Sequence, residues 1–314
     1  MLSFDILISF FISFIIGILF YKISIPFLKK NIISNPNLRS SHLIPKANGG
    51  GIIFVTLFLI VSFCLKVYWP LSLLPLAIIG FFDDIKSQSQ KLRFAVQATT
   101  SIYLNLLFLN KILILGNSLF YLFLISLFLI FLSIAIINFV NFMDGIDGLV
   151  TSNILCLLIM KFYFGDSSII YLIGFLSSFL YFNWYPSKIF MGDVGSTFLG
   201  GSLVYILISS ESVELFFAYL IASGPIIIDP AICILRRFKN SENIFRAHKK
   251  HLYQRLVTGG LEHWKVSCLY LFSTSIICLG YIWGNIKLEL FILILLCIIA
   301  YILEKKYATP FDNF

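Results

Sequence analysis

The sequence predicts an all-α protein, a polytopic bundle of transmembrane helices. Of its 314 residues, 59% are hydrophobic and only 12% are charged, with a mean hydropathy of +0.96, whereas soluble domains carry about 25% charged residues. Long apolar runs alternate with short polar links along the whole chain, which is typical of helical membrane proteins. We therefore expect residues 1–314 to form a single integral membrane domain.

We expect about eleven spans, or ten if the weakest run does not cross. A helix needs about 20 apolar residues to cross a bilayer, and the runs that approach this length are 2–21, 48–65, 67–82, 94–110, 118–137, 149–164, 168–184, 197–210, 214–235, 264–283 and 287–303. The first run has no basic region before it and no small-residue cleavage site after it, so it is predicted to be retained.

The basic residues predict the orientation. If the N-terminus is outside, only Lys66, Lys111, Lys161 and Lys287 of the 23 lysines and arginines fall in outside segments. The positive-inside rule then predicts an N-out, C-in chain, and it explains the net charge of +8 without nucleic acid. The longer polar loops all fall on the cytoplasmic side, and we expect the chemistry there. These loops are about 22–47, 83–93, 138–148, 185–196 and 236–263.

The six cysteines lie inside or at the edges of apolar runs, and none forms a C-x-x-C pair. We expect them to be small buried hydrophobic residues rather than disulfide or zinc ligands.

Two adjacent carboxylates, Asp83 and Asp84, end the third run, and Lys86 follows them. Neighbouring helical residues point about 100° apart, so both can serve one ligand only if the helix ends there. A solvated helix end is the alternative, but Lys or Arg is more usual at such an end. We favour a role in metal binding or proton transfer.

The densest polar stretch is 138–149, N-F-V-N-F-M-D-G-I-D-G-L. Asn138, Asn141 and Asp144 share one face if the preceding helix continues, and Asp147 follows within the same ten residues. A simple Asn/Asp/Gly turn is the alternative. Four ligand-type side chains in so short a stretch favour a binding site.

Asp193 stands between two glycines, with hydroxyl side chains next, at the start of a run. One carboxylate beside free backbone N–H groups suits Mg²⁺ and phosphate oxygens, although an N-cap would look similar.

The loop 236–263 contains His248, His251 and Arg255. Arginine and histidine there favour phosphate binding. A loop that is basic because of topology is one alternative, and a zinc site is another, but no third ligand is evident nearby. Asp229 lies within an apolar run, where an ion pair with Arg236, two turns further on, competes with a functional role.

Taken together, the motifs D-D-I-K, N-F-V-N-F-M-D-G-I-D-G, G-D-V-G-S and H-K-K-H-L-Y-Q-R-L resemble the polyprenyl-phosphate N-acetylhexosamine-1-phosphate transferases of glycosyltransferase family 4. This family includes relatives of the phospho-N-acetylmuramoyl-pentapeptide transferase of peptidoglycan synthesis. The resemblance runs from about residue 37 to residue 256. The H-x-x-H-x-Y-Q-R-L ending is similar to the branch that primes O-antigen, capsule and related polysaccharides. One position departs from the family pattern, because Asn48 stands where an arginine is common.

The resemblance implies transfer of a sugar-1-phosphate from a UDP-N-acetylhexosamine to undecaprenyl phosphate at the cytoplasmic face of a bacterial inner membrane. It implies a requirement for Mg²⁺, for which Mn²⁺ is a substitute. The implied metal ligands are Asp193 and Asp144, and the implied catalytic residues are Asp83, Asp84, Asp144 and Asp147. Substrate contacts are expected from Asn138, Asn141, Lys86, His248, His251 and Arg255.

Alternatives remain open at the level of function. A transporter or flippase of lipid-linked sugar would use similar basic loops, but no acidic residue lies at the clear midplane of a span, which argues against ion-coupled transport. The peptidoglycan transferase is the second alternative, and an inactive scaffold is the third. The transferred sugar (GlcNAc, FucNAc or QuiNAc) and the choice between a monomer and a homodimer are not indicated by the sequence.

Overall fold

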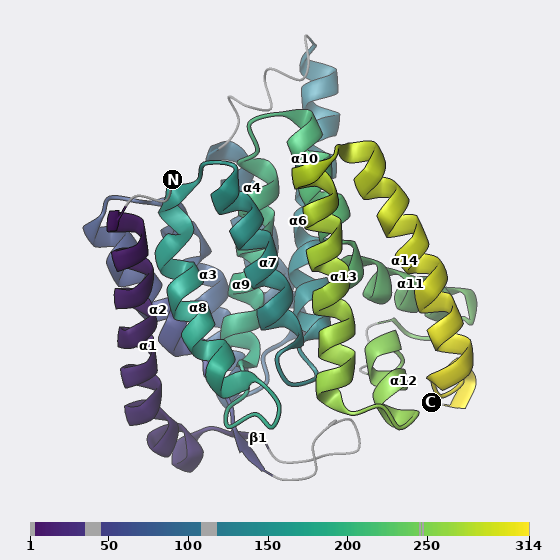
Figure 1. The fold of residues 1–314 in the computed structure, drawn as a ribbon, viewed down its shortest axis with the longest axis horizontal. Coiled ribbons are helices and arrows are strands. Elements are labelled where there is room, and N and C mark those ends of the chain that lie inside the picture. The colour runs from purple at the N-terminus through teal and green to yellow at the C-terminus, as the bar shows by residue number, and fades with distance from the viewer. Residues whose placement is uncertain (1–3, 35–44, 108–117, 245, 247, 314) are drawn as a thin grey trace.

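The computed structural model describes residues 4–34, 45–107, 118–244, 246 and 248–313, and these form one bundle of helices (Figure 1). The prediction of an all-α protein is confirmed. Residues 35–44 of the predicted loop 22–47 and the end of the predicted run 94–110 lie outside the described residues. The helices are α1 (Phe4–Asn31), α2 (Gly51–Cys64), α3 (Leu74–Ile85), α4 (Gln90–Leu107), α6 (Leu119–Met143), α7 (Leu149–Tyr163), α8 (Ile170–Asn183), α9 (Gly192–Ile208), α10 (Val213–Ala222), α11 (Gly224–Lys239), α12 (Leu252–Thr258), α13 (His263–Trp283) and α14 (Ile286–Tyr307).

Short elements connect these helices. Two strands of two residues each pair in antiparallel fashion, with Ile33 opposite Ala47 and Ser34 opposite Lys46. They are β1 (Ile33–Ser34) and β2 (Lys46–Ala47), and three 3₁₀ turns accompany them, η1 (Trp69–Leu73), η2 (Ser167–Ile169) and η3 (Phe311–Asn313).

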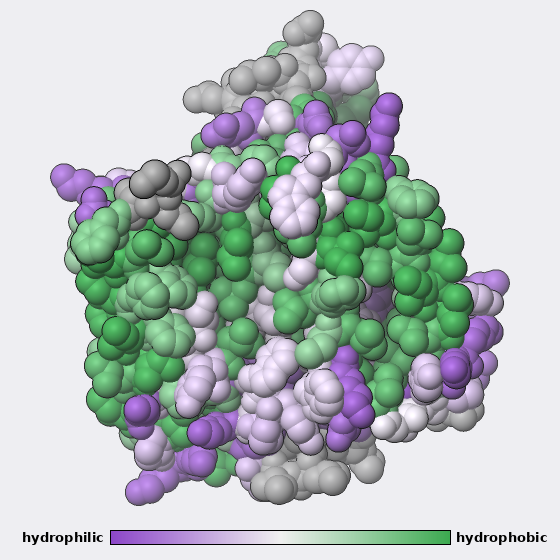
Figure 2. All heavy atoms as spheres, viewed as in Figure 1, coloured by the Kyte–Doolittle hydropathy of each residue, from purple (hydrophilic) through white to green (hydrophobic). Residues whose placement is uncertain are grey.

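Several helices are long and apolar enough to cross a membrane, so the chain is a multi-pass membrane protein. Among the described residues, α1, α6, α13 and α14 meet this test individually, and α10 with α11 meets it as a pair bent by 69°. Apolar residues cover the middle of the face in Figure 2, and hydrophilic residues gather at its upper and lower edges. The two termini lie at opposite ends of the bundle (Figure 1). The count of about eleven spans and the N-out, C-in orientation stay predictions.

The helix bounds differ from the expected ones where polar residues continue a helix. Helix α6 runs on to Met143, so it includes part of the predicted loop 138–148. Helix α9 begins at Gly192, five residues before the predicted run. The predicted run 214–235 is broken after Ala222, because Pro225 occupies the first turn of α11, where its missing N–H is tolerated.

Helix α9 forms the centre of the bundle, and almost all of its residues are buried against α2, α3 and α6. Glycines bring the backbones together there. A Cβ on Gly51 would lie 2.4 Å from the Cα of Gly195, and a Cβ on Gly80 would lie 2.5 Å from the carbonyl oxygen of Asp193. Small residues at such crossings let membrane helices approach closely. The close approach places the end of α3 beside the start of α9.

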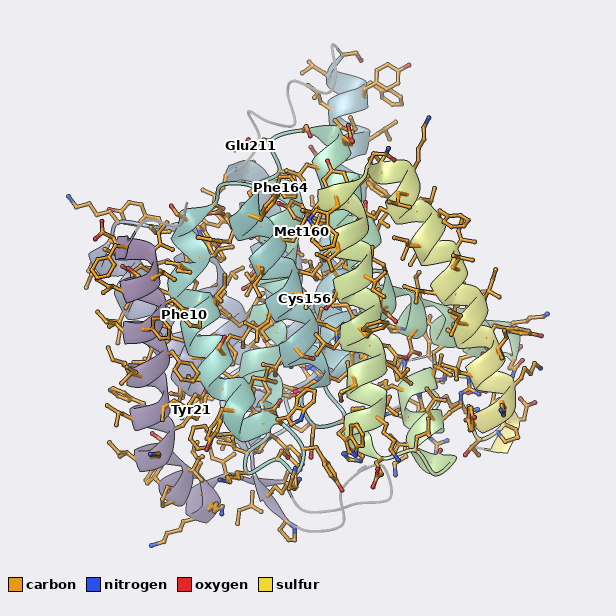
Figure 3. All side chains as sticks on the ribbon, viewed as in Figure 1. Phe10, Tyr21, Cys156, Met160, Phe164 and Glu211 are labelled. Atoms are coloured by element: carbon orange, nitrogen blue, oxygen red, sulfur yellow. The ribbon has the colours of Figure 1, made fainter. Side chains whose placement is uncertain are left out.

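Helix α1 packs along α8, with Phe10 and Tyr21 on the side that faces the bundle (Figure 3). The ring of Tyr21 contacts the rings of Phe179 and Phe182 at 5.6 and 5.5 Å between centroids. Its hydroxyl donates to the carbonyl oxygen of Gly50 at 2.9 Å. Aromatic packing and this buried hydrogen bond thus fix the chain just before α2.

Candidate active site

The candidate site lies where three helix ends meet. Asp83 and Asp84 lie in the last turn of α3, Asn141 lies in the last turn of α6, and Asp193 lies in the first turn of α9. Asp144 follows α6 directly as its C-cap residue. Three of the sequence motifs thus contribute carboxylates or amides to a single cluster at the helix ends.

Asp84 caps the start of α9. Its Oδ1 accepts hydrogen bonds from the backbone N–H of Asp193 at 2.9 Å and from Asn48 Nδ2 at 3.0 Å, and its Oδ2 accepts from the N–H of Val194 at 3.1 Å. A carboxylate is stabilised at a helix N-terminus. Gly192 has φ +76°, and a Cβ there would lie 2.4 Å from Asp84 Oδ2. The glycine is therefore required by both conformation and space.

Asp83 is held by a different set of donors. Its Oδ1 accepts from the backbone N–H of Gln88 at 2.5 Å, and its Oδ2 pairs with Arg93 Nη1 at 3.0 Å. Arg93 Nη1 also lies 3.7 Å from Asp193 Oδ2. One guanidinium therefore links two of the predicted site carboxylates.

Asn141 orients the remaining oxygen of Asp193. Its Nδ2 donates to Asp193 Oδ1 at 2.9 Å and to Ser196 Oγ at 2.8 Å. The side chain of Asp193 is still 33% exposed, so it can reach a ligand from solvent. This contact brings together Asn141, predicted as a substrate contact, and Asp193, predicted as a metal ligand.

Asp144 carries the least compensated charge of the cluster. Burial, together with the nearby charges of Asp84 and Asp147, raises the pKa of Asp144 to about 7. Within the described ranges, no side chain or backbone N–H donates a hydrogen bond to its carboxylate. A group of acids with one arginine has an excess of negative charge, and oxygen ligands of this kind suit a hard divalent cation. The donor set therefore fits Mg²⁺, with Asp193 and Asp144 as the predicted ligands.

Asp147 was expected to be catalytic, but its carboxylate is bound by Ser187 and lies beside Lys46. Its Oδ2 accepts from the backbone N–H of Ser187 at 3.0 Å, its Oδ1 accepts from Ser187 Oγ at 2.8 Å, and Lys46 Nζ lies 3.5 Å away. Burial alone would raise its pKa, but His263, Ser187 and Lys46 outweigh burial and lower the pKa to about 2. With a side chain only 1% exposed, Asp147 fixes the loop before α9 and cannot contact a substrate in this conformation.

Two other residues that were expected to contact the substrate, Asn138 and Lys86, lie outside the acidic cluster. Asn138 pairs with Gln97 of α4, with Nδ2 to Oε1 at 2.8 Å and Gln97 Nε2 to Asn138 Oδ1 at 3.2 Å. This reciprocal amide pair joins α4 to α6 and occupies the side chain that was expected to bind substrate. Lys86 is exposed at the end of α3, and no ion pair of Lys86 is found among the described residues.

The histidine segment lies against the end of α6. The ring of His251 stacks on Phe142 at 6.0 Å between centroids, and the hydroxyl of Tyr253 donates to the carbonyl oxygen of Phe142 at 2.9 Å. Burial and neighbouring positive charge lower the pKa of His248 to about 3 and that of His251 to about 4. Both imidazoles are therefore neutral at pH 7, and any contact they make with phosphate is a neutral hydrogen bond.

Asp229 holds the start of α12, which follows this segment, by hydrogen bonds. Its carboxylate accepts from the backbone N–H of Leu252 at 2.7 Å, from that of Tyr253 at 3.1 Å, and from the hydroxyl of Tyr270 at 2.6 Å. It therefore caps α12. The ion pair with Arg236 that the spacing allowed is not formed, because Arg236 pairs with Glu304 instead.

The side chain of Arg255, predicted to grip a substrate phosphate, is held by other partners in this structure. Its Nε donates to the carbonyl of Lys250 at 3.1 Å, its Nη1 to that of Thr309 at 3.1 Å, and its Nη2 to Glu304 Oε1 at 2.6 Å. The side chain is 3% exposed. Arg255 ties α12 to α14 and to the C-terminal segment.

Arg93, Asn48 and Lys46 contact the predicted acids, and sequence reasoning did not select them. A signal existed for Arg93, which lies in the first turn of α4, where the helix dipole disfavours a cation unless an acid is near. Asn48 was noted only as a departure from the family pattern. Its amide supplies one neutral donor to Asp84.

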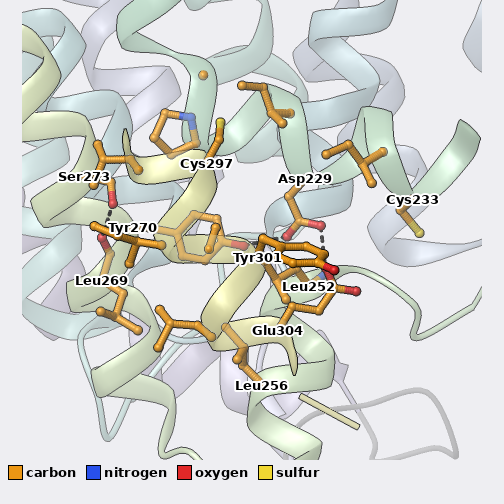
Figure 4. A pocket seen from close by; sticks show the side chains of 18 of the residues that line it. Asp229, Cys233, Leu252, Leu256, Leu269, Tyr270, Ser273, Cys297, Tyr301 and Glu304 are labelled. Atoms are coloured by element: carbon orange, nitrogen blue, oxygen red, sulfur yellow. Dashed lines mark hydrogen bonds between the residues drawn. The ribbon is translucent and has the colours of Figure 1, made fainter. Parts of the chain in front are cut away.

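A pocket of about 370 Å³ lies beside α11, α13 and α14 rather than at the acids. Figure 4 shows its lining, which includes Leu256, Leu269 and Cys297, with Asp229 and Tyr270 hydrogen-bonded at one side. Most of the lining is aliphatic or aromatic. Arg236, Lys250 and Glu304 also line it.

Comparison with known proteins identifies the relatives of the chain. Residues 66–211 match the family model described as Glycosyl transferase family 4. A Bacillus subtilis protein named "Probable undecaprenyl-phosphate N-acetylglucosaminyl 1-phosphate transferase" is 35% identical over 150 residues, which cover 43% of this chain and 42% of the relative. A Fervidobacterium nodosum "Phospho-N-acetylmuramoyl-pentapeptide-transferase" is 31% identical over 228 residues, which cover 65% of this chain and 74% of the relative.

The match to the Bacillus relative spans less than half of that protein, whereas the match to the Fervidobacterium relative spans about three quarters of it. The longer match includes a larger share of this chain than the family model does. The chain belongs to glycosyl transferase family 4.

Proposed function

We propose that this chain transfers the sugar-1-phosphate of a UDP-N-acetylhexosamine to undecaprenyl phosphate, which gives undecaprenyl-diphospho-sugar and UMP. The observation that carries the proposal is the meeting of Asp84, Asp144 and Asp193 at the ends of three helices. The names of both relatives, which are transferases of phosphate-linked amino sugars, support it. The product would begin a surface polysaccharide of the O-antigen or capsule type.

The proposed reaction joins two anions that repel each other. An oxygen of the lipid phosphate attacks the sugar-bearing phosphorus of the UDP-sugar, a P–O–P bond forms, and the bond to the departing UMP breaks. Mg²⁺, when bound, would neutralise charge on the phosphates and align them for in-line displacement. Asp193 and Asp144 would hold the ion, and Asn141 would keep Asp193 in the required orientation.

Asp83 would position this site rather than accept a proton. A phosphate monoester has a second pKa near ~6, so the lipid phosphate is mostly dianionic at neutral pH and needs little deprotonation. Both oxygens of Asp83 are already engaged, by Gln88 and Arg93. We expect Asp83→Asn to reduce UMP release at every pH from 5 to 9. An acidic limb that is present in the wild type and absent in Asp83→Asn would instead establish a general base.

The pocket beside α11, α13 and α14 would hold part of the isoprenoid chain of the acceptor. Its lining is mainly apolar, and it borders Asp229, whose carboxylate caps α12 next to the site. We expect Leu256→Trp, which fills the pocket, to raise the KM for undecaprenyl phosphate without changing the KM for the UDP-sugar.

The test is UMP release by the purified full chain with undecaprenyl phosphate and Mg²⁺. The donors are UDP-GlcNAc, UDP-FucNAc, UDP-QuiNAc and UDP-MurNAc-pentapeptide, each offered alone. Release with one of the first three supports the polysaccharide branch, and release with the pentapeptide donor alone supports the peptidoglycan branch. If no donor yields UMP, the enzyme proposal fails and the flippase alternative takes its place.

A further inference from the structure

Three side chains that ligate soft metals meet between α11 and α12. Cys233 lies on α11, and His248 and His251 lie in the segment that follows it. Their ligand atoms all lie within 4.8 Å of one another. No third ligand for the two histidines is evident from the sequence, because Cys233 is fifteen residues upstream of His248 and only the fold brings it near.

We propose that Cys233, His248 and His251 bind Zn²⁺ or a similar borderline-soft cation, at a site separate from the acidic cluster. One thiolate and two imidazoles are ligands that zinc favours over Mg²⁺, which prefers oxygen. Three protein ligands leave a fourth position open, as in zinc sites that exchange a ligand. Binding releases the thiol proton of Cys233 to solvent, since the thiolate is the ligand.

The geometry needs only a small adjustment. Cys233 Sγ lies 4.0 Å from His248 Nδ1, and a sulfur and a nitrogen bound to one tetrahedral zinc lie roughly 3.6 Å apart, given bonds of about 2.3 and 2.0 Å. His248 Nδ1 accepts the backbone N–H of Lys250 at 3.1 Å, and metal binding at this nitrogen would replace that hydrogen bond. Cys233 is 2% exposed, and His251 is 3% exposed.

An independent observation points to a missing partner. His251 Nδ1 is buried and makes no hydrogen bond with any residue that the structure describes. Asp229 Oδ1 lies 3.9 Å away and accepts the backbone N–H of Leu252 instead. Buried polar atoms are nearly always satisfied by a protein group, water or an ion. A cation held by this nitrogen would satisfy it.

The surrounding charges permit a cation at this position. Lys250 and Arg237 are near, but each is paired with Glu242, at 2.7 and 3.1 Å. The Asp229 carboxylate also lies close, with Oδ1 3.9 Å from His251 Nδ1. The thiolate adds a further negative charge when the metal binds.

A metal bound at this site would affect the acidic cluster through α6. The ring of His251 stacks on Phe142, the residue after Asn141. This consequence rests on the proposed function and on the expectation from the sequence that both histidines contact the donor substrate. Zn²⁺ would withdraw them from that contact and inhibit UMP release.

The binding claim is tested with Co²⁺, whose bond to a thiolate gives a charge-transfer absorption band that oxygen ligands do not produce. The purified, metal-stripped full chain is titrated with Co²⁺ in excess Mg²⁺, which occupies oxygen sites. We expect one Co²⁺ per chain with this band, and its displacement by Zn²⁺. Cys233→Ser should abolish the band. His248→Gln should weaken Co²⁺ binding by more than about tenfold, the lower limit seen even for outer-shell partners.

Cys278→Ser is the matched control, because Cys278 is also buried but belongs to α13, and it should keep the band. No band in the wild type, or a band that survives in Cys233→Ser, overturns the proposal. If Cys233→Ser does not fold, the half-buried His248→Gln decides alone. Failure of UMP release in the wild type would refute the proposed function and leave this spectroscopic result intact.

Discussion

We expect Asp147 to position the loop before α9 rather than to contact the substrate, and a substitution can test this. Its carboxylate is buried and receives two hydrogen bonds from Ser187, with Lys46 3.5 Å away. Replacement by asparagine keeps the shape but removes the charge and places an amide N–H₂ opposite a donor. We expect Asp147→Asn to be less stable than the wild type at neutral pH.

The magnitude follows from the pKa. The pKa of Asp147 falls from 3.8 to about 2 on folding, and a shift of nearly two units corresponds to about 2 kcal/mol of unfolding free energy. Because the folded pKa is the lower one, this stability is fully present above about pH 4 and is lost as the pH falls towards 2. The difference between wild type and Asp147→Asn should therefore be constant from pH 7 to pH 5 and shrink below pH 4.

The assay is unfolding in mixed micelles, followed by tryptophan fluorescence at pH 7, 5, 4, 3 and 2.5. Asp312→Asn is the control, because Asp312 is an exposed residue near the C-terminus and its replacement should change nothing. A wild-type advantage that is the same at pH 2.5 as at pH 7 would refute the reasoning. So would a fully stable Asp147→Asn that has lost UMP release, which would return Asp147 to the catalytic residues.

Three further predictions concern the acidic cluster and its supports. Asp144 must be ionised to hold Mg²⁺, and its pKa without metal is about 7. The half-activating Mg²⁺ concentration should therefore be constant above pH 8 and rise about tenfold per unit below pH 6, a dependence that Asp144→Asn should abolish. Arg93→Met should lower UMP release by at least about tenfold, since it leaves Asp83 and Asp193 uncompensated, whereas Lys91→Met on the same helix should not. Asn138→Leu should cost about 1–3 kcal/mol of stability by leaving Gln97 unpaired, and the double variant Gln97→Leu/Asn138→Leu should recover most of it.

The sequence predicted the helices well because membrane spans impose a strong pattern. Each of the eleven apolar runs contains a helix or, for 214–235, a bent pair. The errors lie at the ends, where hydropathy loses its signal. Asn138 and Asn141 are helical although they are polar, because Gln97 and Asp193 satisfy their amides. Such partners come from other parts of the chain, so local sequence cannot reveal them.

The candidate site was predicted by residue type, but contacts decide which residues can face a ligand. Arg255 looked like a phosphate ligand because it is a basic residue in a polar loop. Its three donor nitrogens are in fact used by Lys250, Thr309 and Glu304. Two of these partners, Thr309 and Glu304, lie about fifty residues further along the chain than Arg255. No spacing rule connects positions so far apart.

Residues of the stretch 138–149 have two different roles in the fold, one at the acidic cluster and one in holding a loop. Helix α6 ends at Met143, so Asn141 still faces Asp193. The turn that follows is bonded to the end of α8 and to the loop after it, through Gly148 and Asp147. Asp144 stays beside Asp84 and keeps a raised pKa, whereas Asp147, one turn later, meets Ser187 and Lys46 and has a lowered one. Two Asp-Gly pairs that are alike in sequence thus differ by about five pKa units in the fold. The difference arises from burial and the charges of Asp84 and Asp147 in one case, and from hydrogen-bond donors and Lys46 in the other, and it makes Asp144 the better candidate for holding a cation.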